Sequence, residues 1–231
     1  MRVVFVTGGN KGLGYEAARR LIANGYKVYI GARDRERGAA ASRALGACFV
    51  QLDVTDDASV RSAASEITRI EGHLDVLINN AGISGGMVKP EDMSVEILKK
   101  TYETNVFGIV RVTHCFLPLL RKSIAPVIVN VSSGLGSFTR VLDAEAVESK
   151  VHSAHYNSSK SAVNMLTLQY AKSLPEFRVN CVDPGYTATD LNHHSGPQSV
   201  TEGTDAIVRM AMIEKDGPTG TLSDRHGRQG W

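Results

Sequence analysis

The sequence predicts an α/β fold in which a doubly wound parallel sheet is covered by helices on both faces. Short, uninterrupted apolar runs alternate with amphipathic segments along the chain. Strands that lack polar alternation are typical of a parallel sheet buried on both faces. No linker, repeat, charge run or low-complexity segment divides the 231 residues, so we expect residues 1–231 to form a single domain.

Four strands and three helices are predicted in the first part of the chain. The strands are short β-branched runs, and the helices show apolar residues at helical spacing. We expect strands at 3–7, 27–32, 48–52 and 74–79, and helices at 13–24, 35–45 and 55–71. Gly25, Gly46 and Gly72 stand where these helices should end, and Thr55 is the candidate N-cap of the third.

The alternation continues in the second part of the chain. We expect helices at about 95–121, 154–173 and 202–214, and strands at 127–132, 178–182 and 220–222. Pro118 predicts a break or kink near the end of the first of these helices. An insertion at about 134–153 shows no clear period and carries Asp143, Glu145 and Glu148. It is either a solvated insertion or one wall of a substrate cleft.

Composition excludes several classes of protein. The net charge of +2 argues against nucleic-acid binding as the main task. No apolar run approaches about 18 residues, so no membrane span is expected, and the first apolar run is too short for a signal peptide. Cys48, Cys115 and Cys181 are widely spaced, which supports neither a disulfide framework nor a metal site. We expect a cytoplasmic protein.

A glycine-rich turn follows the first predicted strand. It reads Thr7-Gly8-Gly9-Asn10-Lys11-Gly12-Leu13-Gly14 and stands between a buried strand and a helix, as a dinucleotide fingerprint requires. Gly8 allows a sharp turn, Gly12 lets the backbone approach a pyrophosphate, and Gly14 lets the helix pack closely on the strand. The helix N-terminus then faces the phosphates. A Rossmann-type site is therefore expected, and its cofactor-binding residues are Gly8, Asn10, Lys11, Gly12, Leu13 and Gly14.

Tyr156 and Lys160 lie four residues apart and therefore on one face of a predicted helix. A phenol has an ordinary pKa of about 10, but a nearby ammonium lowers that pKa. The pair can then move a hydroxyl proton while a hydride moves at a nicotinamide. Ser133 stands at the carboxyl end of the fifth strand, where its hydroxyl can donate to a carbonyl oxygen.

Taken together, these motifs resemble the short-chain dehydrogenase/reductase family, in particular its carbonyl-reductase-like members. The resemblance covers about residues 3–192 and includes the glycine turn, Asn79-Asn80-Ala81-Gly82, Asn105, Asn130-Val131-Ser132-Ser133, Tyr156-Asn157-Ser158-Ser159-Lys160 and Pro184-Gly185, followed by Thr187 and Thr189. It implies that the cofactor also contacts Asn80, Ala81, Gly82, Tyr156, Lys160, Pro184, Gly185, Thr187 and Thr189.

The resemblance also implies roles for four catalytic residues. Tyr156 would be the general acid/base, and Lys160 would also hold the nicotinamide ribose. Ser133 would orient the carbonyl, and Asn105 would anchor a water relay behind Lys160. The family pattern favours the second serine of the motif, so Ser132 is expected to be structural. Asn105 could instead be a helix-kink residue.

The end of the second strand predicts NADP(H) as the cofactor. An acid at this point binds the ribose 2′-hydroxyl of NAD, whereas an Arg accommodates a 2′-phosphate. Here Ala32 is followed by Arg33, and Lys11 lies on the same side of the adenosine. Two cations suit a dianionic phosphate, unless Asp34 neutralises Arg33.

Asp53 and Val54 follow the third strand. They resemble the family's adenine contact, in which the acid meets the amino group and the valine lies against the ring. Asp53 could alternatively compete with Thr55 as a helix N-cap.

The substrate is expected to be an uncharged aldehyde or ketone. Residues 84–88 and 134–137, the insertion and Tyr186 should line the cleft, and they offer no clear fixed charge to a carboxylate. Reduction is the expected direction, because cytosolic NADPH is held mostly reduced. The alternatives are a non-catalytic NADP(H)-binding regulator and an epimerase or dehydratase of the family's extended branch.

Ser133 and Tyr156 are 23 positions apart, a spacing between those of classical members and carbonyl reductases. In carbonyl reductases a longer insertion covers the helix surface through which other members dimerise. The shorter insertion here favours a homo-oligomer that associates through the helices containing Asn105 and Tyr156.

Overall fold

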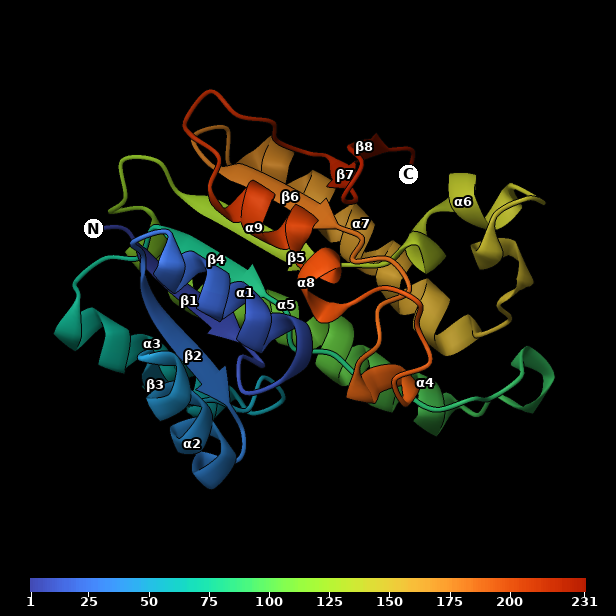
Figure 1. The fold of residues 1–231 in the computed structure, drawn as a ribbon, viewed down its shortest axis with the longest axis horizontal. Helices are drawn as coiled ribbons and strands as arrows, with labels where there is room; N and C mark the ends of the chain where they lie inside the picture. The colour runs from blue at the N-terminus through green and yellow to red at the C-terminus, as the bar shows by residue number, and fades with distance from the viewer.

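One eight-stranded sheet runs through residues 1–231 of the computed structural model (Figure 1). The strand order is β3-β2-β1-β4-β5-β6-β7-β8, and every neighbouring pair is parallel except β7 with β8. The strands are β1 (Val3–Thr7), β2 (Lys27–Ala32), β3 (Cys48–Gln51), β4 (Val76–Asn79), β5 (Val127–Val131), β6 (Arg178–Val182), β7 (Leu222–Ser223) and β8 (Arg228–Gln229). The predicted doubly wound α/β fold is confirmed.

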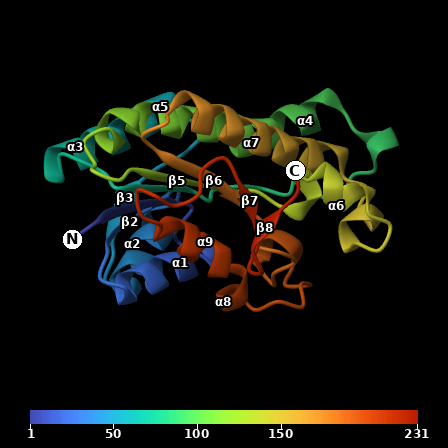
Figure 2. The same cartoon turned by 90° about the horizontal axis from the view of Figure 1, so that it is seen from above.

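Two layers of helices cover the sheet (Figure 2). One layer holds α1 (Gly12–Ala23), α2 (Arg35–Leu45), α8 (Val200–Gly203) and α9 (Asp205–Ala211). The opposite layer holds α3 (Asp57–Ile70), α4 (Val95–Tyr102), α5 (Gly108–Leu120) and α7 (Ala154–Ser173). The connections contain α6 (Phe138–Leu142) and the 3₁₀ turns η1 (Pro90–Asp92), η3 (Gly134–Gly136), η4 (Val147–Lys150) and η5 (Asp190–Asn192). No helix combines the length and apolarity needed to cross a membrane.

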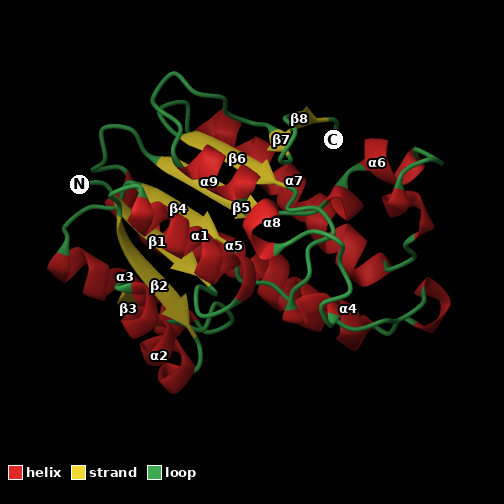
Figure 3. Ribbon diagram, in the orientation of Figure 1, coloured by secondary structure: helices red, strands yellow, loops and turns green.

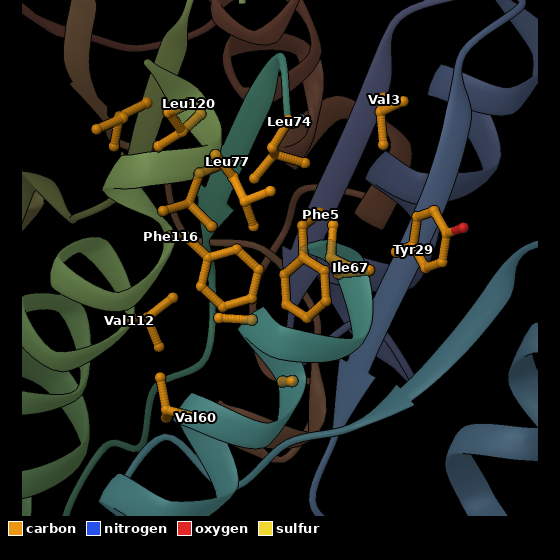
Figure 4. Packing of buried hydrophobic residues seen from close by; sticks show 14 of the residues in the cluster. Val3, Phe5, Tyr29, Val60, Ile67, Leu74, Leu77, Val112, Phe116 and Leu120 are labelled. Carbon is orange, nitrogen blue, oxygen red and sulfur yellow. The ribbon is translucent and has the colours of Figure 1, made fainter. Parts of the chain in front are cut away.

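The two apolar layers follow the alternation of side chains along the strands. On β1, Phe5 belongs to the cluster beneath α3, α5 and α7, whereas Val4 and Val6 belong to the cluster beneath α1, α2 and α9. Phe5 packs on Phe116 of α5 with ring centroids 4.7 Å apart (Figure 4). Because β1, β4 and β5 are buried along their whole length, the sheet is a rigid platform for the residues at its edge.

The strand order reverses between β1 and β4. Val6 of β1 pairs with Ile30 of β2 on one side and with Ile78 of β4 on the other. The chain leaves the sheet over opposite faces on the two sides of this point. In open α/β sheets, the crevice outside the carboxyl ends of the strands at such a reversal is where ligands bind.

The predicted break at Pro118 is wrong, because α5 continues through this residue to Leu120. Pro118 stands in the last turn, where its missing N–H removes a single intrahelical hydrogen bond. The irregularity lies earlier, at the π-helical turn η2 (Glu103–Phe107), which joins α4 to α5. A single π-helical turn has no hydrophobic pattern that distinguishes it from an α-helix, so the sequence does not predict it.

The predicted N-cap of α3 is also wrong. Asp56 caps the helix, since its side chain accepts a hydrogen bond from the Ala58 N–H at 2.8 Å. Thr55 is instead bound by Asp53 Oδ1, which accepts from the Thr55 N–H at 2.9 Å and from its hydroxyl at 2.7 Å. Asp53 thus forms a turn with Thr55 rather than capping the helix.

The remaining differences fall on short elements. The expected helix at 202–214 is two helices, α8 and α9, and the strand expected at 220–222 is β7 at Leu222–Ser223. The strand β8 was not predicted. The fourth strand begins at Val76 rather than at 74, and the insertion contains η3, α6 and η4. Elements of two to seven residues are too short to show a clear period.

Candidate active site

The predicted site residues lie on segments that follow the carboxyl ends of the strands. Figure 3 shows these strands side by side within one sheet. Each of the first six strands is followed by at least one of these residues. After β1 come Gly8, Asn10, Lys11, Gly12, Leu13 and Gly14, after β2 comes Arg33, and after β3 come Asp53 and Val54. After β4 come Asn80, Ala81 and Gly82, after β5 comes Ser133, and after β6 come Pro184, Gly185, Thr187 and Thr189. Tyr156 and Lys160 come from α7, and Asn105 comes from η2. Six parallel strands therefore bring segments that are distant in sequence to one edge.

The glycine turn leaves no room for side chains. A Cβ atom on Gly14 would lie 2.5 Å from the Gly8 carbonyl oxygen, so only glycine lets α1 start this close to β1. Gly12 has φ +55°, a left-handed conformation that favours glycine. Lys11, the N-cap of α1, makes no side-chain capping bond, which leaves the first N–H groups of the helix free for an anion.

Asn80 holds the turn in place. Its Nδ2 donates to the carbonyl oxygens of Thr7 at 2.9 Å and Gly8 at 3.2 Å. The Thr7 hydroxyl oxygen in turn accepts from the N–H groups of Asn80 and Ala81, at 2.9 and 3.0 Å. These bonds join the carboxyl ends of β1 and β4 at the reversal of strand order.

Arg33 is exposed and forms no ion pair. Asp34 does not neutralise it, because the Asp34 carboxylate caps α2 at the Arg37 N–H, 3.0 Å away, and pairs with the Arg37 guanidinium at 3.5 Å. The guanidinium of Arg33 is therefore available to a phosphate at the end of β2.

Lys11 already has an anionic partner, which the sequence did not predict. Its Nζ lies 2.7 Å from Asp190 Oδ2, and Asp190 Oδ1 lies 2.9 Å from His194 Nε2. The Lys11 and His194 contacts hold the pKa of Asp190 below its ordinary value. Asp190 is 179 positions from Lys11, so no local pattern links the two residues.

Near the adenine side of the expected cofactor, Val54 is 8% exposed. The bonds from Thr55 both end on Asp53 Oδ1, so Asp53 Oδ2 has no protein partner. A carboxylate oxygen and an apolar side chain thus lie next to each other after β3.

Lys160 is buried beside Tyr156. Its Nζ donates to the Val131 carbonyl oxygen at 2.9 Å and lies 5.5 Å from the centroid of the Tyr156 ring. Burial lowers the pKa of Lys160 to about 8, although the negative charge of Asp183 opposes this shift.

We expected the ammonium of Lys160 to lower the pKa of Tyr156, but this pKa is raised above its ordinary value. Burial of the phenol is the main cause and the negative charge of Asp183 adds to it, while a hydrogen bond with the Ser133 side chain acts the other way. The ammonium of Lys160 is engaged by the Val131 carbonyl, and its charge does not outweigh the burial. Tyr156 therefore holds its proton at neutral pH in this state.

The two serines after β5 differ as expected. Ser132 is 2% exposed, and its hydroxyl donates to Asn164 Oδ1 at 2.5 Å. Ser133 is partly exposed, and its Oγ accepts only the Leu135 N–H, at 3.2 Å. The Ser133 hydroxyl is also hydrogen-bonded with the Tyr156 side chain, so the two hydroxyls lie together where a carbonyl oxygen could bind.

Asn105 lies within the π-helical turn, as expected of a residue at a helix irregularity, and its role in a water relay behind Lys160 stays a prediction. Its Oδ1 accepts from the Ile83 N–H at 2.9 Å, and its Nδ2 donates to the Ile83 carbonyl at 2.9 Å and to Ser159 Oγ at 3.1 Å. A Cβ on Gly82 would lie 3.3 Å from Asn105 Oδ1 and 3.8 Å from Lys160 Nζ.

Asp183 is a residue of the site that the sequence patterns did not indicate. It stands between the last residue of β6 and Pro184 and is 5% exposed. An acid directly after a buried strand and directly before the Pro-Gly pair was the available signal.

A family model described as short chain dehydrogenase matches residues 2–199. The chain is 32% identical to salutaridine reductase of Papaver bracteatum, over 97% of this chain and 94% of that protein. It is 34% identical to (+)-neomenthol dehydrogenase of Arabidopsis thaliana, over 97% of this chain and 96% of that protein. The structure of an NADPH-bound carbonyl reductase from chicken fatty liver superposes with a TM-score of 0.87 at 26% identity, covering 100% of both chains.

Proposed function

The chain belongs to the short-chain dehydrogenase/reductase family and is an NADP(H)-dependent oxidoreductase, and we propose that it reduces an uncharged, apolar ketone or aldehyde to the alcohol. The observation that carries this proposal is the convergence of three groups at the end of β5. These are the partly exposed hydroxyl of Ser133, the protonated phenol of Tyr156 and the buried ammonium of Lys160.

The edge of the sheet fits the cofactor. The glycine turn provides a cradle that a Cβ would fill, the N-terminus of α1 is uncapped, and Arg33 has no partner among the acids. Arg33, with Lys11, would hold the 2′-phosphate, and Asp53 and Val54 would hold the adenine. The rest of the cofactor would contact residues that follow β4 and β6: Asn80, Ala81, Gly82, Pro184, Gly185, Thr187 and Thr189. When bound, NADPH supplies the hydride.

The protein groups supply the proton and the positioning. Ser133 donates a hydrogen bond to the substrate carbonyl oxygen and fixes its direction. Tyr156 donates its proton to the same oxygen as negative charge develops there. Lys160, anchored on the Val131 carbonyl, places a positive charge next to the phenol and stabilises its conjugate base. Asn105 supports the segment behind Lys160 through Ile83.

Exposed apolar side chains support an uncharged, apolar substrate. Met87 follows β4, Phe138 and Leu142 follow β5, and Tyr186 and Leu191 follow β6, all on segments that leave the carboxyl edge of the sheet. Two acids near the serine loop, Glu148 and Asp183, are largely buried and bonded to protein groups.

The test is NADPH oxidation with apolar cyclic ketones, each paired with a carboxylate-bearing analogue of similar size. We expect turnover of the neutral member of each pair and little turnover of the acid. Tyr156→Phe keeps the ring and removes the proton donor, so kcat should fall at least about 100-fold while NADPH affinity is kept. Near-normal turnover by this variant, or no NADPH oxidation with any carbonyl, would contradict the proposal.

We also propose a homo-oligomer that associates through the outer face of α5. Phe107, the last residue of η2, and Val110 of α5 are exposed and line a groove of about 730 Å³ between α3 and α5. The insertion does not cover this face, since α6 joins the C-terminal residues, with Thr139 N–H donating to the Trp231 carbonyl at 2.9 Å. A cytoplasmic location is proposed as well, and the three free cysteines support a reducing compartment.

A further inference from the structure

One side chain of α7 holds the loop that carries Ser133 on both sides of this serine. Asn164 is 5% exposed. Its Oδ1 accepts from the Ser132 hydroxyl at 2.5 Å, one residue before Ser133. Its Nδ2 donates to the Gly136 carbonyl oxygen at 3.0 Å, three residues after Ser133. A carboxamide carries an acceptor and a donor on one carbon, so a single side chain can bind both ends of loop 132–136.

The ends of this loop also lie directly on the backbone of α7. A Cβ atom on Gly136 would lie 2.5 Å from the Lys160 carbonyl carbon, so the contact requires glycine. The Ser132 hydroxyl lies 3.3 Å from the Lys160 carbonyl oxygen, and Ser161 Oγ donates to the Gly136 carbonyl oxygen at 3.0 Å. Both ends of the loop are therefore buried, whereas Ser133 between them is partly exposed.

Asn164 continues a series of α7 residues that begins with Tyr156 and Lys160. Successive members are four positions apart, so the three side chains lie on one side of the helix. The same helix thus carries the phenol and the carboxamide that binds the Ser133 loop. The relative position of the two hydroxyls then depends on one rigid element rather than on two separate segments.

We propose that Asn164 is a positioning residue that holds loop 132–136 on α7 and thereby fixes the Ser133 hydroxyl relative to the Tyr156 phenol. The inference rests on the proposed roles of Ser133 and Tyr156 in carbonyl reduction. Both hydroxyls must reach the same carbonyl oxygen, and a displacement of about 1 Å can lower a rate about 100-fold. Because Asn164 acts through Ser133, its contribution should disappear when the Ser133 hydroxyl is removed.

The experiment is a double-mutant cycle on kcat for NADPH-dependent carbonyl reduction. Asn164→Ala is made in the wild-type protein and in Ser133→Ala. In the wild-type background we expect kcat to fall about tenfold, with less than about a twofold change in KM for NADPH. In the Ser133→Ala background, the same substitution should lower the remaining kcat less than about twofold, since residues that act as a unit are not additive.

Asn164→Leu is the second variant, because it removes the carboxamide but keeps a side chain of similar size. In both variants the Ser132 hydroxyl and the Gly136 carbonyl oxygen keep partners in the Lys160 carbonyl and the Ser161 hydroxyl, which favours folding. Asn164→Leu should show the same dependence on Ser133 as Asn164→Ala. Thermal denaturation and NADPH fluorescence titration verify that each variant is folded and binds cofactor.

Asn180→Ala is the matched control, because Asn180 is also buried and also binds two points of a loop through its carboxamide. Its Nδ2 donates to the Pro218 carbonyl oxygen at 2.7 Å, and its Oδ1 accepts from the Thr221 N–H at 3.1 Å. This segment carries no residue of the proposed catalytic set. The control should lower the melting temperature and change kcat by the same factor with and without the Ser133 hydroxyl.

Equal fold losses of kcat from Asn164→Ala in the two backgrounds would overturn the inference, as would wild-type kcat in a folded Asn164 variant. The proposed function fails in a different way, through retained activity of Tyr156→Phe. An inactive Tyr156→Phe, together with Asn164 variants whose effects do not depend on Ser133, would remove the role of Asn164 and leave the reductase assignment in place.

Discussion

At the scale of single residues, we expect the choice of cofactor to depend on the end of β2. Ala32 is 3% exposed and carries no charge that would repel a phosphate, and Arg33 has no acid beside it. Asp34 is committed to α2 through Arg37, so its carboxylate does not compete with a ligand. From the sequence alone, Asp34 could either neutralise Arg33 or leave it free for a phosphate. The contacts of Asp34 with Arg37 favour the second case.

The first prediction concerns Arg33→Ala. A charge-assisted contact to phosphate contributes roughly 1.5–3 kcal/mol, so NADPH should bind about ten- to a hundredfold more weakly, with little effect on NADH. The measurement is kcat/KM for both cofactors at one ionic strength. An equal loss with NADPH and NADH would mean that Arg33 supports the fold instead.

Ala32→Asp tests the same surface in the opposite direction. The new carboxylate would repel a 2′-phosphate and offer acceptors to the two ribose hydroxyls. We expect the preference to move toward NADH by more than in Arg33→Ala. If NADPH remained preferred by the wild-type ratio, the phosphate would not lie at the end of β2.

The residues that sequence motifs could indicate are those adjacent to strand ends. Gly8, Asn80, Ser133 and Gly185 are each read from a few neighbouring letters, because a parallel sheet places strand ends together. The partner of Lys11 could not be found in this way, since Asp190 is 179 positions away. The raised pKa of Tyr156 depends on burial, which no local pattern measures.

At the scale of elements, helix termini illustrate what a local pattern can decide. Both Thr55 and Asp56 precede α3 and both are good N-cap types. Asp53 captures Thr55 with two hydrogen bonds, so the helix starts one residue later on Asp56. The start of α3 is therefore decided by Asp53, which binds Thr55, and by Asp56, which caps the helix.

This assignment predicts a difference between two alanine variants. Asp56→Ala should destabilise the protein by about 1 kcal/mol, because the Ala58 N–H loses its acceptor. For a chain of this length, that loss lowers the melting temperature by about 2–4 °C. Thr55→Ala should lower it less, and the reverse order would restore Thr55 as the N-cap.

The π-helical turn η2 shows an element that the sequence could not reveal. Apolar spacing over 95–121 predicts one continuous helix, and α4, η2 and α5 do follow one another without a loop. The wide turn places Asn105 so that its side chain binds both backbone groups of Ile83. This tertiary contact with Ile83 is not encoded in local propensity.

At the scale of the whole molecule, the proposed association of subunits requires a helix face that the rest of the chain leaves free. Val110 lies on the outer face of α5, whereas Ile124 lies in the loop between α5 and β5. We expect the wild-type protein to show a light-scattering mass that is a multiple of 24.9 kDa. Val110→Glu should shift the mass toward 24.9 kDa, because a charge at the interface is left unpaired.

Ile124→Glu is the control for this prediction. Ile124 is 91% exposed, and a charge there should leave the mass unchanged. A wild-type mass near 24.9 kDa at micromolar concentration, or dissociation by Ile124→Glu alone, would contradict an interface on α5.

The contact between Lys11 and Asp190 has a consequence for the way NADPH affinity responds to salt. If Lys11 moves from Asp190 to the 2′-phosphate, one surface ion pair is broken for each one formed. Added electrolyte weakens both pairs, so the two effects largely cancel in the binding equilibrium. Arg33 gives up no such partner, and the ionic-strength dependence of binding the 2′-phosphate should therefore arise from Arg33 rather than from Lys11.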